Sequence, residues 1–243
     1  MSGFFENMME DYGGGETQGK FPVSLGFTET SSEVVLDLKQ LKHVLVSGMS
    51  QSGKSTMIRK LLPSLVKYAD TVIYSTKDSD FIDYANKLYI CSDVAMMEGL
   101  VRRTVGEIER RNDSLKAARQ KDGYQVQCGD KPLVIVIDEF QSFAEMAGEA
   151  AMKALKRIVR EGAGLNVFLY IITQTPNKKI LSDGLRDNIM TDIAFKQRDA
   201  SGSRMAIGNR DAEYLELHQC IVRNVDKTFK VTRLNKTVKI DKS

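Results

Sequence analysis

Short apolar runs alternate with longer segments of helical periodicity over most of this 243-residue chain. The most apolar run, 133–137, contains no polar residue, which is typical of a central parallel strand that is buried on both faces. Similar runs at 44–47, 71–74, 88–91 and 165–173 predict further buried strands. Strands that alternate with helices indicate an α/β domain, with a mainly parallel sheet and helices on both of its faces.

The remaining segments complete this RecA-like α/β pattern. Residues 220–223 and 228–233 predict a hairpin, which would form an antiparallel edge at the C-terminal end of the sheet. Residues 1–20 are acidic and glycine-bearing, and we expect them to be a linker or flexible segment before a domain at 21–243. Further strands are expected at 21–27, 34–38 and 192–196, and helices after residue 54 and at 94–120, 143–160, 180–189 and 201–207.

Composition narrows the range of functions. The net charge is only +3, from 35 basic and 32 acidic residues, so the charge balance does not indicate a nucleic-acid partner. Three widely spaced cysteines form no metal-binding or redox motif. No apolar run approaches about 20 residues, the length that a membrane-spanning helix needs.

The strand at 44–47 leads into a complete phosphate-binding loop, the Walker A motif. Its glycines allow backbone conformations in which successive N–H groups converge on phosphates at the start of a helix. Lys54 would reach the β- and γ-phosphates of ATP, and the Ser55 hydroxyl would hold Mg²⁺. The expected nucleotide-binding residues are Gly48, Met49, Ser50, Gln51, Ser52, Gly53, Lys54, Ser55 and Thr56.

The apolar strand at 133–137 ends in Asp138 and Glu139, the Walker B pattern. Asp138 would support the Mg²⁺ ion, and Glu139 would orient or deprotonate the attacking water. Gln174 ends the next buried strand and would sense the γ-phosphate. We expect Lys54 and Asp138 to meet across adjacent strand ends at the carboxyl edge of the sheet.

Phosphoryl transfer also needs a cation beside the leaving charge, often an arginine from a neighbouring subunit. Arg204 and Arg160 are the candidates for such an arginine finger, and Arg186, Arg198 and Arg210 stay open beside them. His43 and His218 accompany no motif, and we expect each to have a packing or surface role.

Beyond these motifs the chain resembles the FtsK/SpoIIIE family of P-loop ATPases. Glu-Ile-Glu-Arg-Arg at 107–111 resembles the family's Glu-Met-Glu-Arg-Arg, and Thr-Gln-Thr-Pro at 173–176 resembles Thr-Gln-Arg-Pro. Asn-Ile-Met-Thr-Asp-Ile-Ala-Phe at 188–195 resembles Asn-Ile-Pro-Thr-Arg-Ile-Ala-Phe. Further similarities lie at 160–166, 203–204 and 212–215, so the resemblance extends over about residues 20–235.

The resemblance implies ATP and Mg²⁺ as cofactors and a RecA-like domain that works beside similar domains, in tandem or in a homo-oligomeric ring such as a hexamer. Two subtypes compete. One is a double-stranded DNA translocase of chromosome partition or conjugative transfer. The other is an ATPase module of the type VII secretion coupling protein, the EssC/EccC kind, which handles secreted helical-hairpin proteins.

Departures from the DNA translocase pattern favour secretion. Ser-Thr-Lys stands at 75–77 where those translocases have Asp-Pro-Lys, and Thr175 replaces an arginine. The secretion interpretation implies an exposed apolar pocket for a helical tail and a cytoplasmic position at the inner face of the membrane, anchored through other parts of a longer protein. A third alternative is a substrate receptor that holds ATP but turns it over slowly.

Overall fold

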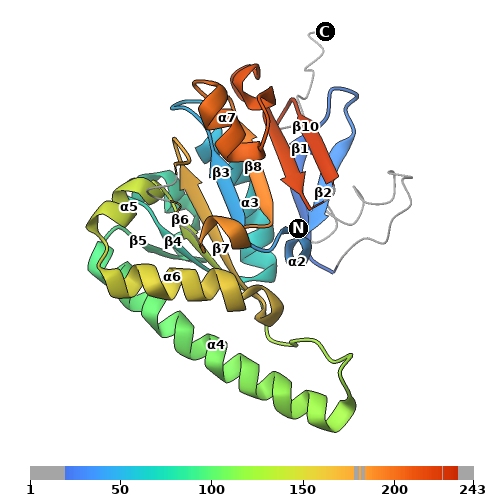
Figure 1. The fold of residues 1–243 in the computed structure, drawn as a ribbon, viewed down its shortest axis with the longest axis vertical. Coiled ribbons are helices and arrows are strands. Elements are labelled where there is room, and N and C mark those ends of the chain that lie inside the picture. Colours follow the sequence, from blue (N-terminus) through green and yellow to red (C-terminus); the bar gives the residue numbers. More distant parts are fainter. Residues whose placement is uncertain (1–19, 178–180, 182–183, 226, 235–243) are drawn as a thin grey trace.

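A computed structural model describes residues 20–177, 181, 184–225 and 227–234. The expected linker at 1–20 and the tail after Leu234 therefore lie almost wholly outside the described residues. In the described part, one eight-stranded sheet forms the centre of the molecule (Figure 1). From edge to edge its strands are β10 (Lys227–Val231), β9 (Cys220–Asn224), β8 (Thr191–Phe195), β3 (Val44–Ser47), β7 (Val167–Thr173), β6 (Leu133–Ile137), β4 (Asp70–Tyr74) and β5 (Tyr89–Cys91).

The strands from β8 to β5 run parallel, whereas β9 is antiparallel to both β8 and β10. The sequence predicted this mainly parallel sheet with an antiparallel C-terminal edge. The expected contact between the strands of Lys54 and Asp138 is wrong, however, because β7 lies between β3 and β6. The local apolar pattern does not reveal this strand order, because β6 and β7 are both apolar and either could pair with β3.

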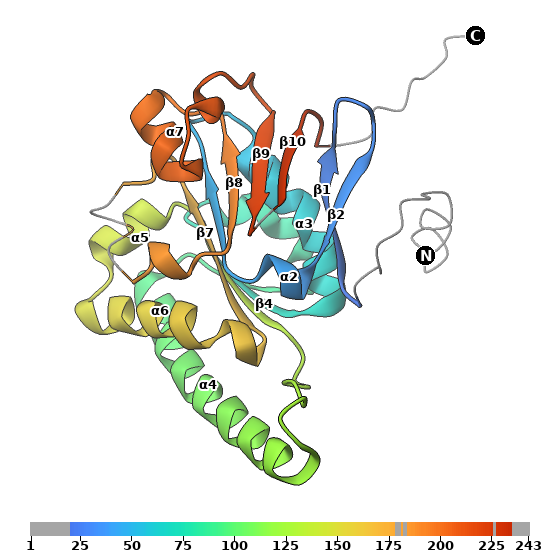
Figure 2. The ribbon, with the colours of Figure 1, turned by 45° about the vertical axis from the view of Figure 1, so that its right-hand side comes forward.

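Helices cover both faces of the sheet, as expected (Figures 1 and 2). Alternate side chains of the central strands point to opposite faces, so Val136 packs on the side of α3 and Ile137 on the side of α4, α5 and α6. A separate antiparallel pair, β1 (Pro22–Phe27) and β2 (Glu33–Asp37), packs beside α3. The α-helices are α2 (Leu38–Leu41), α3 (Lys54–Tyr68), α4 (Val94–Asp122), α5 (Phe140–Met146), α6 (Glu149–Glu161) and α7 (Ala200–Ile207); 3₁₀ turns are η1 (Asp78–Tyr84), η2 (Ala163–Leu165), η3 (Arg186–Asn188) and η4 (Asp211–Glu213).

Two expected helices differ from the structure. The helix predicted over 143–160 is two helices, because Ala147 and Gly148 are extended and separate α5 from α6. The helix predicted over 180–189 is wrong within its described residues, which form only η3. There Asp187 accepts a hydrogen bond from the Gly184 N–H and Asn188 donates one to the Gly184 carbonyl, and such local bonds compete with helix formation.

The motif at 107–111 has a structural role in this fold. Arg111 is buried on α4 and donates hydrogen bonds to the carbonyls of Leu165 and Asn166, at 2.9 and 3.0 Å. Glu107 pairs with Arg111 at 2.7 Å and also with exposed Arg110. The motif thereby ties the long helix α4 to the turn that starts β7, the strand beside the Walker B strand.

Candidate functional site

The phosphate-binding loop joins the end of β3 to the start of α3, as the motif requires. Gly48 has φ +152°, and a Cβ there would lie 2.6 Å from the Cβ of Phe195 and 2.8 Å from Ser52 Oγ. Gly53 has φ +115° at the start of α3, whose first turn has no side-chain cap. The buried Ser52 hydroxyl also has no hydrogen-bond partner in the described part of the chain. The first N–H groups of α3 therefore have no side-chain partner at the helix start, and the glycines let the loop bring its backbone close to a ligand. Such an arrangement fits a phosphate group.

Lys54 is folded back over this loop. Its ammonium group donates hydrogen bonds to the carbonyls of Gly48 and Met49, at 2.7 and 2.8 Å. Burial lowers the pKa of Lys54, while the nearby carboxylates of Asp138 and Glu139 act in the opposite direction. The lysine is therefore held close to the place where a phosphate would lie.

The Walker B carboxylates lie at the carboxyl end of β6. Asp138 is only 8% exposed, and its two oxygens accept hydrogen bonds from the Ser75 hydroxyl at 3.2 Å and from the Glu139 N–H at 3.1 Å. Burial raises the pKa of Asp138. Glu139 follows with φ +53°, a conformation that is uncommon for a residue with a side chain. This turn directs two successive carboxylates toward one edge of the sheet.

Glu139 already has two partners. Lys77 pairs with its Oε1 at 2.6 Å, and the Thr76 hydroxyl donates to its Oε2 at 3.1 Å. The pairing with Lys77 lowers the pKa of Glu139. Thr76 and Lys77 were not predicted as site residues. One signal in the sequence could have indicated them, because polar residues that follow a strand parallel to β6 lie at the same edge of the sheet as the Walker B carboxylates.

A single cavity brings half of the predicted site residues together at the carboxyl ends of β3, β7 and β6. Gln174, at the end of β7, faces the same space as the lysine and the carboxylates. The other expected loop residues are not among those that line it: Gly48, Met49, Ser52, Gly53 and Thr56. The cavity is lined by Ser50, Gln51, Lys54, Ser55, Lys77, Asp138, Glu139, Ile172, Thr173 and Gln174.

These residues fit a magnesium nucleotide. Ser55 and Asp138 are the side chains that could support Mg²⁺, and the phosphates would supply further oxygen ligands. Mg²⁺ is commonly held by one or two protein oxygens together with substrate phosphates and water. The described residues contain no cluster of three or more His, Cys, Asp or Glu side chains that could hold a metal ion.

The two finger candidates lie outside this cavity. Arg160 pairs with Glu161 at 2.6 Å at the end of α6, close to the start of β7. The cavity lies at the other end of this seven-residue strand, which spans about 20 Å. Arg204 is exposed on α7 and has no ion-pair partner among the residues that the structure describes. Either arginine could act only on a neighbour's nucleotide, so both stay predictions.

The other arginines and the histidines are placed as follows. The Arg186 guanidinium is paired with buried Asp192 at 3.0 Å. Arg210 pairs with Glu213. His43 is fully buried, in agreement with a packing role. His218 is exposed, and its backbone N–H donates to the Ser52 carbonyl at 2.9 Å, so the chain near 218 supports the phosphate-binding loop.

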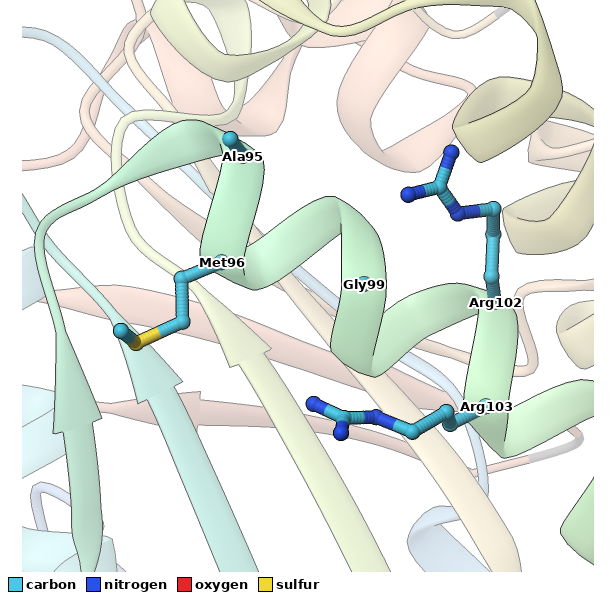
Figure 3. A pocket seen from close by; sticks show the side chains of 5 residues that line it. All are labelled: Ala95, Met96, Gly99, Arg102 and Arg103. Atoms are coloured by element: carbon cyan, nitrogen blue, oxygen red, sulfur yellow. The ribbon is translucent and has the colours of Figure 1, made fainter.

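Two further hollows lie around the start of α4. Figure 3 shows the first, in which Arg103 extends past Gly99 toward Met96 while Arg102 points away. Neither arginine has an ion-pair partner in the described ranges. The second hollow lies beside β5 and is largely apolar, with Ile82 70% and Met96 47% exposed.

Comparisons with known proteins agree with this architecture. The model of the FtsK/SpoIIIE family matches residues 8–71. The alignment with the DNA translocase SftA of Bacillus subtilis has a length of 211 residues at 28% identity, and it covers 79% of this chain and 22% of that protein. The alignment with the DNA translocase FtsK of Haemophilus influenzae has a length of 240 residues at 25% identity, and it covers 82% of this chain and 45% of that protein. The chain thus spans about a fifth to about half of the length of these relatives.

Solved structures show the same RecA-like fold. The conjugation coupling protein TcpA of pCW3, in its monomer form with ATPγS, has a TM-score of 0.78 and 20% identity over 90% of this chain and 67% of that chain. The cytoplasmic domain of the Thermomonospora curvata type VII secretion ATPase EccC has a TM-score of 0.72 and 21% identity over 95% of this chain and 30% of that chain.

None of the helices within the described ranges combines the length and the apolar character that crossing a membrane requires. The order of the motifs, the parallel sheet that carries them and the matches to family and relatives agree with one another. By these comparisons the chain is similar to the FtsK/SpoIIIE family of P-loop proteins.

Proposed function

We propose that this chain is a motor domain that binds ATP with Mg²⁺ and hydrolyses it. One observation carries the proposal: a single cavity unites Lys54 and Ser55 of the Walker A loop with Asp138 and Glu139 of Walker B and with Gln174. These residues come from three separate strands, and their meeting at one sheet edge is what phosphoryl transfer requires.

Each residue has a defined task in the proposed reaction. Lys54 leaves the loop carbonyls and binds the β- and γ-phosphates, and the loop N–H groups bind the remaining phosphate oxygens. Bound Mg²⁺ would neutralise the charge that develops on the phosphates, with Ser55 and Asp138 holding it. Glu139 orients and deprotonates the attacking water, and Gln174 contacts the γ-phosphate or that water.

A neighbouring domain is part of this proposal, because no arginine lines the cavity among the residues that the structure describes. Arg204 is the better candidate for a finger that reaches a neighbour's nucleotide, since it is exposed and unpaired in the described part. Arg160 is already paired with Glu161. A homo-oligomeric ring or a tandem array of similar domains would bring such an arginine to each site.

For the moved polymer we place double-stranded DNA first. The sequence relatives at 25–28% identity are DNA translocases by name, whereas the similarity to the EccC structure, at 21% identity, supports only the fold. Arg103, which lines the first hollow at α4 and has no ion-pair partner among the described residues, is a basic side chain that could contact a phosphate backbone.

Protein secretion is the second candidate, and the apolar hollow beside β5 favours it. This hollow, with exposed Ile82 and Met96, is of the kind that a helical tail requires. Secreted helical-hairpin proteins would then be the partners. In either case a position at the inner face of the cell membrane would depend on other parts of a longer protein.

The test measures ATP hydrolysis against protein concentration for the wild type, Lys54→Ala and Glu139→Gln. We expect Lys54→Ala to lose ATP binding and Glu139→Gln to bind ATP but to hydrolyse it at least 100-fold more slowly, the lower range of general-base effects. Glu145→Gln, an exposed position on α5, is the control and should leave the rate unchanged. If the wild type binds ATP but hydrolyses it no faster than Glu139→Gln at every protein concentration, the receptor alternative is supported instead.

The polymer is tested by competition. Duplex DNA should bind and accelerate hydrolysis, and both effects should weaken steeply as salt rises. If DNA has neither effect while a secreted helical-hairpin protein binds, the secretion candidate replaces DNA. An Ile82→Asp variant should then lose the protein partner, and an Arg103→Ala variant should keep it.

A further inference from the structure

We propose that Lys77 and Thr76 form a latch that holds the carboxylate of Glu139 away from its position of attack and so keeps ATP hydrolysis slow. The inference rests on the proposed function, because Glu139 is there the residue that activates water. Both contacts come from the loop that follows β4, a strand that pairs directly with β6. The catalytic and the latching residues therefore belong to neighbouring strand ends.

Both oxygens of the Glu139 carboxylate already have a partner. Lys77 Nζ lies 2.6 Å from Oε1, and the Thr76 hydroxyl donates to Oε2 at 3.1 Å. To act on water, Glu139 must direct an unshared electron pair at that water, and an ammonium group at 2.6 Å competes for it. With its backbone turned at φ +53°, Glu139 can leave the latch only by rotating its side chain or by movement of the loop at 75–77.

Fixed neighbours hold the latch in place, which distinguishes it from a chance surface pair. The Lys77 N–H donates to Ser75 Oγ at 3.1 Å, and the buried Ser75 hydroxyl donates to Asp138 at 3.2 Å. The Lys77 carbonyl accepts from the Asp80 N–H at 3.0 Å, which joins the latch to the start of η1. A displacement of η1 would therefore move Lys77 relative to Glu139.

The latch is weak enough to open. The side chain of Lys77 is 62% exposed and that of Glu139 is 28% exposed. An ion pair in such a position is worth little in water, equivalent to a factor of about two to five in an equilibrium. The latch is thus expected to slow hydrolysis by a similar factor until a neighbouring domain or a polymer moves the loop at 75–77.

The test compares single-turnover ATP hydrolysis, which reports the chemical step, in the wild type, Lys77→Ala and Thr76→Val. We expect Lys77→Ala to hydrolyse ATP about two- to fivefold faster, with ATP affinity changed by less than twofold. Thr76→Val should give a smaller increase, and Lys77→Arg, which keeps the ion pair, should stay near the wild-type rate. Lys131→Ala is the matched control, because Lys131 forms a similar exposed pair with Asp70, at 2.7 Å, at the other end of β4.

The outcomes separate the latch from the proposed function. A Lys77→Ala rate equal to or below that of the wild type overturns the latch, and a lower rate together with weaker ATP binding would assign Lys77 to the phosphates instead. Glu139→Gln at the wild-type rate, measured in the same series, overturns the proposed function itself. Circular dichroism melting of each variant excludes unfolding as the cause of any loss.

Discussion

Lowering the pH from 7 to 5 should destabilise this protein chiefly through one histidine. His43 is completely buried between α2 and β3, and its Nδ1 accepts a hydrogen bond from the Leu169 N–H at 3.0 Å. Its Nε2 has no partner among the described residues. Burial, aided by the charge of Lys42, lowers the pKa of His43 from 6.5 to about 4. The ring is thus neutral in the folded protein at any pH above about 4.

The sign of the effect follows from these two pKa values. The unfolded chain binds a proton at His43 near pH 6.5, whereas the folded chain binds it only near pH 4. Stability is therefore lost progressively as the pH falls between these values. The loss amounts to about 2 kcal/mol between pH 7 and 5, and to about 3 kcal/mol once the pH is below 4.

Urea unfolding of the wild type and of His43→Asn at several pH values between 7 and 5 would measure this effect. Asparagine keeps an acceptor for the Leu169 N–H but does not titrate in this range. The variant should start less stable at pH 7 and then change by about 2 kcal/mol less than the wild type between pH 7 and 5. Because Asp138 and the surface carboxylates titrate in both proteins, they cancel in the difference. Equal losses in the two proteins would refute the argument.

Three further substitutions test the fold and the site. Gly48→Ala would place a Cβ 2.6 Å from Phe195 in a backbone conformation with φ +152°, so ATP affinity should fall at least tenfold, a cost of about 1–3 kcal/mol, as isothermal calorimetry would show. Arg111→Ala should reduce the free energy of unfolding by about 3 kcal/mol in urea melts, because the buried guanidinium loses its ion pair with Glu107 and its two hydrogen bonds to the turn before β7. Arg204→Ala should lower the hydrolysis rate of the assembled protein about 1000-fold but leave the affinity for ATP unchanged, as filter binding beside a rate assay would show.

Matched variants serve as controls for these predictions. Gly106→Ala, in α4 with no atom within 4 Å of the added Cβ, should stabilise the protein by about 0.5–1 kcal/mol. Arg110→Ala removes exposed ion pairs with Glu107 and Asp130 and should change the free energy of unfolding much less than Arg111→Ala does. Arg210→Ala, next to α7, should hydrolyse ATP at the wild-type rate. Variants that behave like their controls would contradict the assigned roles.

The local chemistry of the site could be read from the sequence because each motif is contiguous. The glycines at 48 and 53 and the residues Lys54 and Ser55 define a loop whose conformation depends on its own backbone. The apolar run before Asp138 predicts a buried strand, and the edge at which such a strand ends is where ligands bind. The parallel sheet, its antiparallel C-terminal edge and the cavity at its carboxyl end therefore agree with the expectation.

Contacts between distant segments could not be read in this way. That β7 separates β3 from β6 depends on which apolar strand pairs with which, and equally apolar strands do not distinguish these pairings. The break between α5 and α6 and the contact between Lys77 and Glu139 likewise depend on neighbours brought together by the whole fold. The sequence by itself determined which residues meet the nucleotide in the proposed site, because that chemistry is encoded in short motifs. Only the tertiary structure decided which side chains restrain those residues, because long-range packing sets the distances between strand ends.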